Sequence, residues 1–185
     1  MRLVPRAVPL LLLCRLWCPA AGPATVVLQF ERAYSPVALG EMRQEAAFIL
    51  KQAGVDLQWR YREEVSPSES FSNLIVLKFK GACDMTSRPV RPAAEPAALG
   101  YTYVAAGKPL PFSDIECDRI RGSLGAAEGL PGFSSNLVLG QALGRVVAHE
   151  LHHILDQSCE HSRAGWMRKS LSPADLTAAG GRHTD

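Results

Sequence analysis

Three residues near the end of a long apolar segment have the types and the spacing of a zinc-binding catalytic motif. His149, Glu150 and His153 form the pattern H-E-x-x-H. On a helix, residues four apart lie on one face, so His149 and His153 can present two imidazoles to one metal ion. Glu150 can then reach a water molecule bound to that metal without being a ligand itself. The motif predicts a zinc hydrolase with Glu150 as its general base.

A catalytic zinc ion usually has three protein ligands and an open position for water. His161 is the expected third ligand, because the turn that follows the helix is long enough to fold back onto the site. His152 lies about 100° around the helix from the motif face, and His183 lies in the tail, so we expect neither to bind. Glu160 and Asp175 stay open as acidic alternatives.

The motif and the residues after it resemble the metzincin group of zinc metallopeptidases. In that group H-E-x-x-H-x-x-G-x-x-H supplies three histidine ligands, and a methionine turn underlies the metal. His149, Glu150 and His153 match the motif, and Met167 matches the methionine turn. The stretch 142–168 is more specifically similar to exported bacterial zincin-like proteins with H-E-x-x-H, a histidine at a longer spacing, and G-[IL]-M-R. The resemblance implies a zincin-like fold and three histidine ligands.

Two positions depart from the metzincin pattern. Asp156 stands where the pattern has glycine, and Cys159 stands where it has the third histidine. The resemblance to the exported proteins favours His161 over Cys159 as the ligand. A Cys159 thiolate could instead complete a closed zinc site with two histidines, or act as a redox-sensitive thiol beside the metal. The plain alternative is a turn residue without a role.

The elements expected around the motif form an α+β domain. A helix should run from Ser35 to Gly54, the long motif helix from about Asn136 to Leu155, and a short helix should begin after Ser172. The expected strands are 25–30, 55–61, 73–79 and 99–105, with a further short extended segment around 115. We therefore expect a zincin-like, mixed twisted sheet, an active-site helix carrying H-E-x-x-H, and a small C-terminal helical part.

The long helix should present two different faces. Gly140, Gly144 and Ala148 are spaced by four and form a smooth stripe that we expect to lie close against a sheet. Ser134 or Ser135 should cap the helix. The expected core contacts are Leu143, Val147, Leu151 and Ile154. The histidines of the motif lie on the opposing side, which leaves one face for the core and one for the metal.

The N-terminus has the three parts of a secretory signal: two arginines, a short apolar run and a stretch of small residues. We expect residues 1–24 to be a signal peptide and residues 25–185 to be a single zincin-like metallopeptidase domain. Cleavage after Ala21 is the alternative to cleavage after Ala24. The protein should be secreted or periplasmic.

Composition restricts the class of partner. The chain of 185 residues is 47% hydrophobic and 21% charged, which is typical of one folded domain. Three of the 20 basic residues lie in the predicted signal peptide, leaving 17 against 18 acidic residues. No basic stripe remains, so nucleic acid is not an expected partner, and no later run approaches the roughly 20 apolar residues of a membrane span. We expect a monomer that binds a peptide or protein substrate.

Three cysteines follow the predicted signal peptide. In an oxidising compartment Cys83 and Cys117 could form a disulfide bond, which would leave Cys159 as a free thiol. The sequence alone leaves the choice of the pair open.

The expected activity is that of a zinc-dependent endopeptidase. Zinc would lower the pKa of its bound water, Glu150 would accept the proton, and the hydroxide would attack the peptide carbonyl. The substrate backbone should pair with the edge strand at 99–105. Candidates for stabilising the oxyanion are Tyr101, Tyr103 and Arg168. The alternatives are a non-catalytic secreted zinc-binding module and a zinc hydrolase of a non-peptide amide.

Overall fold

The computed structural model describes residues 23–88, 98–125 and 132–178. Within them, five strands form one mixed sheet in the order β2-β1-β3-β5-β4. The strands are β1 (Ala24–Phe30), β2 (Leu57–Tyr61), β3 (Leu74–Lys80), β4 (Gly100–Ala105) and β5 (Lys108–Glu116). The first three strands and β5 run parallel, whereas β4 pairs antiparallel with β5 and forms one edge. The expected mixed sheet is confirmed.

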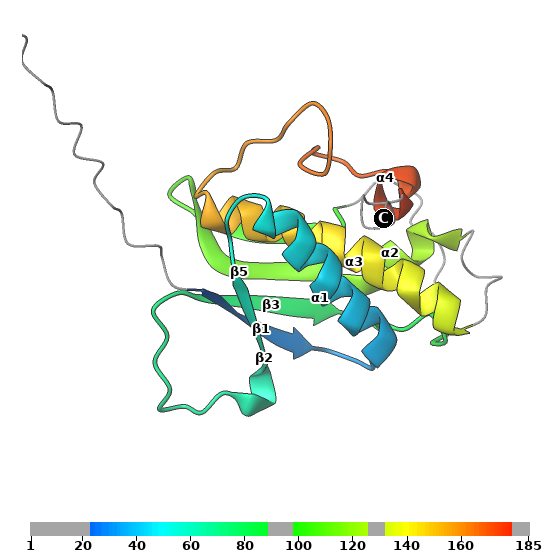
Figure 1. The fold of residues 1–185 in the computed structure, drawn as a ribbon, viewed down its shortest axis with the longest axis horizontal. Helices are drawn as coiled ribbons and strands as arrows, with labels where there is room; N and C mark the ends of the chain where they lie inside the picture. Colours follow the sequence, from blue (N-terminus) through cyan, green and yellow to red (C-terminus); the bar gives the residue numbers. More distant parts are fainter. Residues whose placement is uncertain (1–22, 89–97, 126–131, 179–185) are drawn as a thin grey trace, which may run out of the picture.

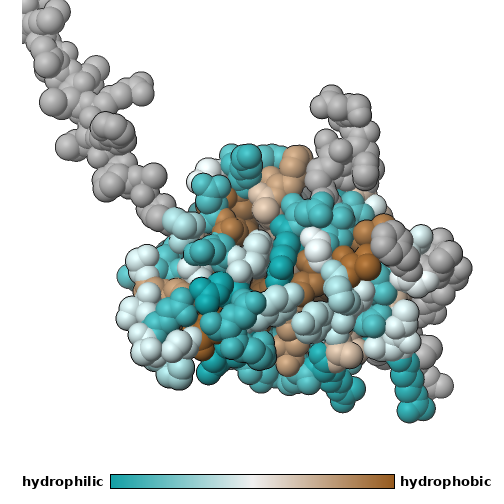
Figure 2. Space-filling view, turned by 60° about the horizontal axis from the view of Figure 1, so that its bottom comes forward, coloured by the Kyte–Doolittle hydropathy of each residue, from teal (hydrophilic) through white to brown (hydrophobic). Residues whose placement is uncertain are grey.

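Four α-helices occur in the same residues. They are α1 (Pro36–Lys51), α2 (Cys117–Ser123), α3 (Gly132–Leu155) and α4 (Pro173–Thr177). The two long helices, α1 and α3, lie side by side on one face of the sheet (Figure 1). The face shown in Figure 2, turned by 60° from the view of Figure 1, is hydrophilic over most of its surface, with separate hydrophobic patches. The expected α+β class is confirmed, and none of the described helices is long and apolar enough to cross a membrane.

The core lies between the sheet and the two long helices. On β3, Ile75, Leu77 and Phe79 are fully buried, while Val76 and Lys78 between them are only partly buried. Successive side chains of a strand point to opposite faces, so this alternation identifies the face that packs against the helices. The helices contribute large buried side chains to the same core, among them Met42, Leu50, Leu139, Leu143 and Leu151.

The smooth stripe of α3 packs against α1, and not against the sheet as its spacing led us to expect. A Cβ atom on Gly140 would collide with the backbone of Ala38, and one on Gly144 would lie 2.5 Å from the Cβ of Glu45. The absence of side chains therefore allows two helix backbones to approach each other. Small residues at intervals of four fit a neighbouring helix as well as a sheet, and the sequence does not distinguish the two.

A buried ion pair fixes the long helices to each other and to the C-terminal segment. Arg145 Nε of α3 lies 3.0 Å from Glu45 Oε1 of α1, and both side chains are buried. The Arg145 guanidinium also donates to the backbone carbonyls of Asp175 and Ala178, in and just after α4. Removal of one partner would leave a buried charge unpaired, which is strongly destabilising. Arg145 therefore holds α4 beside α3.

Most element positions agree with expectation, and two differ. The segment after β5 forms α2, which is too short to show helical periodicity in the sequence. The long helix starts at Gly132, so Ser134 and Ser135 lie inside it and neither is its N-cap. The Ser135 hydroxyl instead donates to the Gly132 carbonyl. At α4 the expected capping box is present, with Ser172 as the N-cap and Asp175 at the third position.

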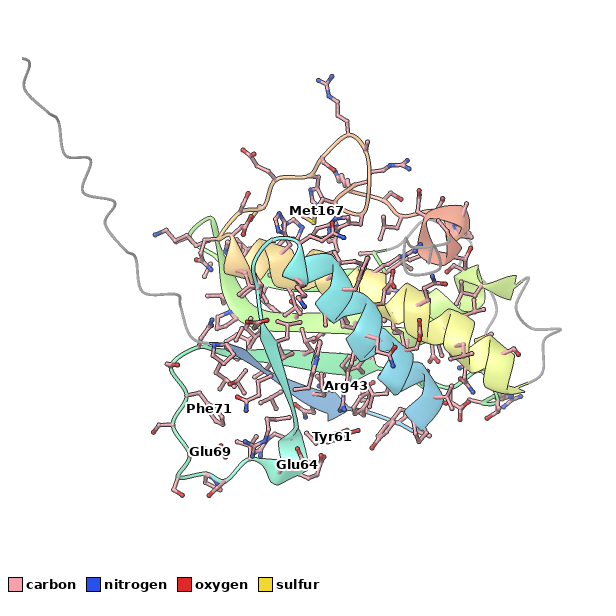
Figure 3. The ribbon with its side chains drawn as sticks, viewed as in Figure 1. Arg43, Tyr61, Glu64, Glu69, Phe71 and Met167 are labelled. Carbon is pink, nitrogen blue, oxygen red and sulfur yellow. A yellow bond between two sulfur atoms is a disulfide. The ribbon has the colours of Figure 1, made fainter. Side chains whose placement is uncertain are left out.

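The other edge of the sheet is formed by β2, and a short 3-10 turn (Arg62–Glu64) follows it. Arg43 of α1 lies over the ring of Tyr61, 4.9 Å from its centroid, and the two lie close together in Figure 3. This cation–π contact joins the helix layer to the edge strand at the side opposite β4.

The disulfide bond between Cys83 and Cys117 is confirmed. Both cysteines are buried, and the bond joins the segment after β3 to the start of α2. Cys159 is free and exposed. Residues 1–22 of the expected signal peptide lie outside the described residues. The strand β1 begins at Ala24, which is buried and paired with Leu57, so cleavage after Ala24 would remove the first residue of the strand.

Candidate metal centre

Three histidines come together at the C-terminal part of α3. His149 and His153 lie one turn apart on the helix, and His161 comes from the loop that follows it. Each offers a ring nitrogen, and these three atoms all lie within 4.8 Å of one another. The ring centroids are 4.7 Å apart for His149–His153, 5.2 Å for His149–His161 and 4.8 Å for His153–His161. This cluster could hold a metal ion, and it consists of the expected ligands.

Backbone carbonyls orient the two helical histidines. The Nδ1 atom of His149 lies 3.0 Å from the carbonyl oxygen of Trp166, and Nδ1 of His153 lies 2.7 Å from that of Ser158. A carbonyl oxygen can only accept a hydrogen bond, so both Nδ1 atoms carry the proton. In each neutral ring the Nε2 lone pair is then left for a ligand. Histidines that bind metals are commonly oriented in this way.

The two Nε2 atoms point at each other. The distance between Nε2 of His149 and Nε2 of His153 is 3.1 Å. Two unprotonated nitrogens repel at this separation unless a proton or a cation lies between them. Two nitrogen ligands at about 2.0 Å from a tetrahedral zinc ion would be about 3.3 Å apart, close to the observed value. The spacing of these two nitrogens therefore fits a shared metal ion of about the size of zinc.

Burial favours the neutral form of two of these imidazoles, those of His149 and His161. The pKa of His149 is lowered to about 4, chiefly by burial. Its hydrogen bond to the Trp166 carbonyl raises the pKa, and the charges of the neighbouring histidines lower it. Burial also lowers the pKa of His161, with smaller contributions from the charges of His153 and Lys169. A neutral imidazole is the form that binds metals. Protonation of His149 is thus a poor explanation for the close Nε2 atoms at neutral pH.

The loop after α3 doubles back because two residues adopt left-handed backbone conformations. Gln157 has φ 51° and Gly165 has φ 76°. The first ends the helix, and the Ser158 backbone N–H donates to the His153 carbonyl there. The second lies in a tight turn closed by a hydrogen bond from Ser162 N–H to the Met167 carbonyl. These turns return the Trp166 carbonyl to the first histidine of the motif.

Met167 lies in the loop beyond α3, above the two long helices in the view of Figure 3. Its neighbour Trp166 supplies the carbonyl that orients His149, and the Trp166 ring contacts His152 edge-on with centroids 5.2 Å apart. The segment with the expected methionine turn is therefore attached to the histidine cluster through its backbone. The place of the Met167 side chain beneath a metal stays a prediction.

Glu150 is held by a hydroxyl from the edge strand. Thr102 of β4 donates to Glu150 Oε2 over 2.6 Å, and the Ser113 hydroxyl of β5 lies 2.7 Å from the Thr102 hydroxyl. Burial raises the pKa of Glu150, while the Thr102 hydrogen bond lowers it. A carboxylate with a raised pKa is better able to take and return a proton near neutrality.

Gly100 makes room for this carboxylate. A Cβ atom at this position would lie 2.6 Å from Glu150 Oε1 and 2.9 Å from Val146 Cγ1. Both are closer than real Cβ atoms approach, so any side chain here would displace Glu150 or α3. The edge strand therefore holds one carboxylate oxygen through Thr102 and leaves the other beside the glycine.

A cleft of about 1020 Å³ contains the histidines and Glu150. Its walls are β4 on one side and the loop 159–171 on the other, with α3 between them. Apolar lining comes from Leu99, Tyr101, Val104, Pro109, Val146 and Leu171. A cleft beside an edge strand can admit an extended chain, which would add to the sheet by backbone hydrogen bonds.

Several residues considered from the sequence lie apart from the cluster. His152 pairs with Asp156 at 3.3 Å, and Asp175 pairs with Arg168 at 3.1 Å. Among the described residues, the candidate metal group contains neither of these, nor Glu160. His183 lies outside the described residues. The structure thus brings together the three expected histidines and none of the described alternatives.

Cys159 lines the cleft but is absent from the candidate metal group. Among the candidates for the oxyanion, Tyr101 and Arg168 also line the cleft. Tyr103 does not line it, and its hydroxyl donates to Asp114 at 3.0 Å.

Sequence reasoning missed Thr102 and the two carbonyls that orient the histidines. The alternation of Tyr101 and Tyr103 in an edge strand signals that Thr102 points to the opposite, inner face. No sequence signal marks a backbone carbonyl, since every residue has one.

Comparisons of this chain with protein-family models, with curated proteins and with solved structures found no match.

Proposed function

We propose that this protein is a zinc-dependent peptidase with a zincin-like active-site helix. One observation carries the proposal: two buried histidines with protonated Nδ1 atoms direct their Nε2 atoms at each other across 3.1 Å, with His161 beside them. The adjacent Glu150 lines the same cleft. A metal, a carboxylate base and an edge strand are the parts that hydrolysis of an extended peptide requires.

His149, His153 and His161 would hold the metal, which would lower the pKa of a bound water and polarise the substrate carbonyl. Glu150 would accept the proton from the attacking water on its free oxygen and deliver it to the leaving amine. Thr102 would keep that carboxylate aimed at the cleft. The strand β4 would hold the substrate backbone, and the walls around it would exclude bulk water.

The resemblance of 142–168 to exported zincin-like proteins supports this assignment independently of the geometry. Export is part of the proposal: residues 1–24 have the composition of a signal peptide, and the Cys83–Cys117 disulfide suits an oxidising compartment. Residues 25–185 would then be one peptidase domain acting as a monomer.

Metal analysis and a cleavage assay test the proposal together. The purified protein should contain about one zinc ion per chain and should cleave bonds in a mixed peptide pool. The Glu150→Gln variant should retain the zinc and lose the cleavage, because the amide cannot accept the proton. An unchanged rate in this variant would refute the mechanism. Cleavage of small amides but of no peptide would favour hydrolysis of a non-peptide amide.

A further inference from the structure

The strongly basic side chains of the cleft have few acidic neighbours within it. Arg119, Arg168 and Lys169 line the cleft, and Glu150 is the sole acidic residue among the described lining residues. Glu150 is buried and bonded to Thr102, whereas the three basic side chains are exposed. The part of the cleft that a ligand meets first therefore has an excess of positive charge.

The acidic partners of the two arginines lie outside the lining of the cleft. Arg119 lies 3.8 Å from Glu116 and donates to the Ala98 carbonyl, while Arg168 forms the ion pair with Asp175. Both arginine side chains are nevertheless 44% exposed. These contacts orient the guanidinium groups without covering them. Each keeps free N–H donors, because an arginine has five.

Of the three basic side chains, Lys169 has the fewest contacts that would offset its positive charge. No ion pair joins it to a residue in the described part of the chain, and its neighbours in the lining are Arg168 and Ser170. Lys169 lines the same cleft as the histidine cluster. An exposed ammonium group beside the metal site and without a carboxylate partner can bind an anionic group of a ligand.

The two arginines lie toward one end of the cleft, where Arg168 pairs with Asp175 of α4, and Lys169 directly follows Arg168 in the chain. Arg119 belongs to α2, which follows β5 and lies near the first residue of β4, Gly100. The hairpin at Val104 and Pro109 forms the other end, without a charged side chain in the lining. Figure 1 shows α2 and α4 beside the N-terminal half of α3, and the hairpin of β4 and β5 beside its C-terminal end.

The direction of β4 predicts which end of a bound peptide would lie at the basic end of the cleft. The strand runs from the basic end toward the hairpin, and it already pairs antiparallel with β5 on its other side. Antiparallel pairing is slightly more stable per residue than parallel pairing. A substrate that added antiparallel to β4 would place its C-terminal side at the basic end.

We propose that the cleft selects peptides with a carboxylate on the C-terminal side of the cleaved bond, recognised by Lys169 with Arg119 and Arg168. The carboxylate belongs to an Asp or Glu side chain or to the free C-terminus of a short peptide. This inference rests on the proposed function, since it assigns the substrate class of the same site.

Binding without turnover tests the inference. The zinc-loaded Glu150→Gln protein is titrated with fluorescent octapeptides that are identical except for Asp, Asn or Lys at one position, scanned along the peptide. Each is made with a free and with an amidated C-terminus. We expect Asp peptides to bind about three- to tenfold more tightly than Asn peptides at low salt, and the ratio to fall as salt is raised. A preference for the free C-terminus alone would identify that carboxylate as the recognised group.

Charge reversal locates the interaction. Lys169→Glu in the same background should abolish or invert the Asp preference, while Arg32→Glu, at an exposed position outside the cleft, should preserve it. Cleaved bonds in a peptide pool should show Asp or Glu enriched after the bond with the wild-type protein and not with Lys169→Glu. If peptides with Asp, Asn or Lys bound equally tightly, the inferred preference for a carboxylate would be wrong, and the proposed peptidase function would be unaffected. Absence of both binding and cleavage would overturn the proposed function with it.

Discussion

The Thr102 hydroxyl lies 2.6 Å from Glu150 Oε2 and joins the edge strand to the proposed general base. It fixes the carboxylate that must be aimed at the reacting water. Both partners are buried, so the bond is protected from competing water. A base held by a neighbouring strand depends on that strand for its orientation, which would give β4 a second role besides the substrate binding proposed for it.

Loss of the Thr102 hydroxyl should slow hydrolysis without removing the metal. Thr102→Val keeps the shape of the side chain but leaves Glu150 Oε2 without its donor, and we expect kcat to fall by about ten- to a hundredfold. Thr102→Ser keeps the hydroxyl and should restore most of the rate. Steady-state kinetics and zinc content measure both effects, with KM expected to change little. Wild-type kcat in Thr102→Val would show that the contact does not position the base.

His161 should matter for metal binding and His152 should not. His161→Ala removes one of three ligands, and we expect zinc affinity to fall by more than about a hundredfold, since even residues that only orient a ligand can cost 10- to 100-fold. His152→Ala is the matched control, because His152 occupies a variable position within the motif but pairs with Asp156. Competition with a chelator of known affinity measures both. If His152→Ala lowered the zinc affinity more than His161→Ala did, the third ligand would be wrongly assigned.

The metal-free protein should lose stability in mild acid through His149. Burial lowers its pKa to about 4, below the value of about 6.5 in an unfolded chain. The unfolded state then binds the proton first, so stability is complete above pH 6.5 and is lost as the pH falls toward 4. The contribution is about 3 kcal/mol.

Urea unfolding of the metal-free protein at pH 7, 5.5 and 4 measures this contribution. The His149→Gln variant is the control, because its side chain does not titrate and its stability should fall less over the same range. Parallel pH curves for the two proteins would contradict a lowered pKa at this histidine.

The sequence predicted the elements that have strong local signals. The helix with H-E-x-x-H, the strands of alternating apolar residues and the capping box at Ser172 all have patterns that depend on near neighbours. The histidine cluster followed from the spacing of two histidines on a helix and from the reach of the loop to His161. These features need no knowledge of the tertiary fold.

Other features depend on contacts between distant residues. The ion pair of Arg145 with Glu45 spans 100 positions, and the contact of Thr102 with Glu150 spans 48. The packing of the Gly140 stripe against α1 likewise depends on which element lies next to α3. Local patterns limit the possible neighbours but do not choose among them, and so the sequence left these contacts unassigned.

The disulfide should contribute to folding and not to metal binding. Cys83 and Cys117 are buried and 34 residues apart, so the bond restricts a long loop of the unfolded chain. Replacement of both by alanine should lower the free energy of unfolding by about 2–4 kcal/mol. Cys159→Ser, at an exposed free cysteine, should change it by less than about 0.5 kcal/mol. Chemical denaturation under oxidising conditions measures the free energy of unfolding of both variants. Equal values for the double alanine variant and for Cys159→Ser would contradict the prediction.

The central claim is that three histidines hold the metal and leave a position open to the cleft. X-ray absorption at the zinc edge of the zinc-loaded protein measures the ligands directly. We expect three imidazole nitrogens at about 2.0–2.1 Å, a further light-atom ligand from solvent, and no sulfur. A zinc–sulfur distance of about 2.3 Å, lost in Cys159→Ser, would show a site closed by the thiolate and would contradict the account.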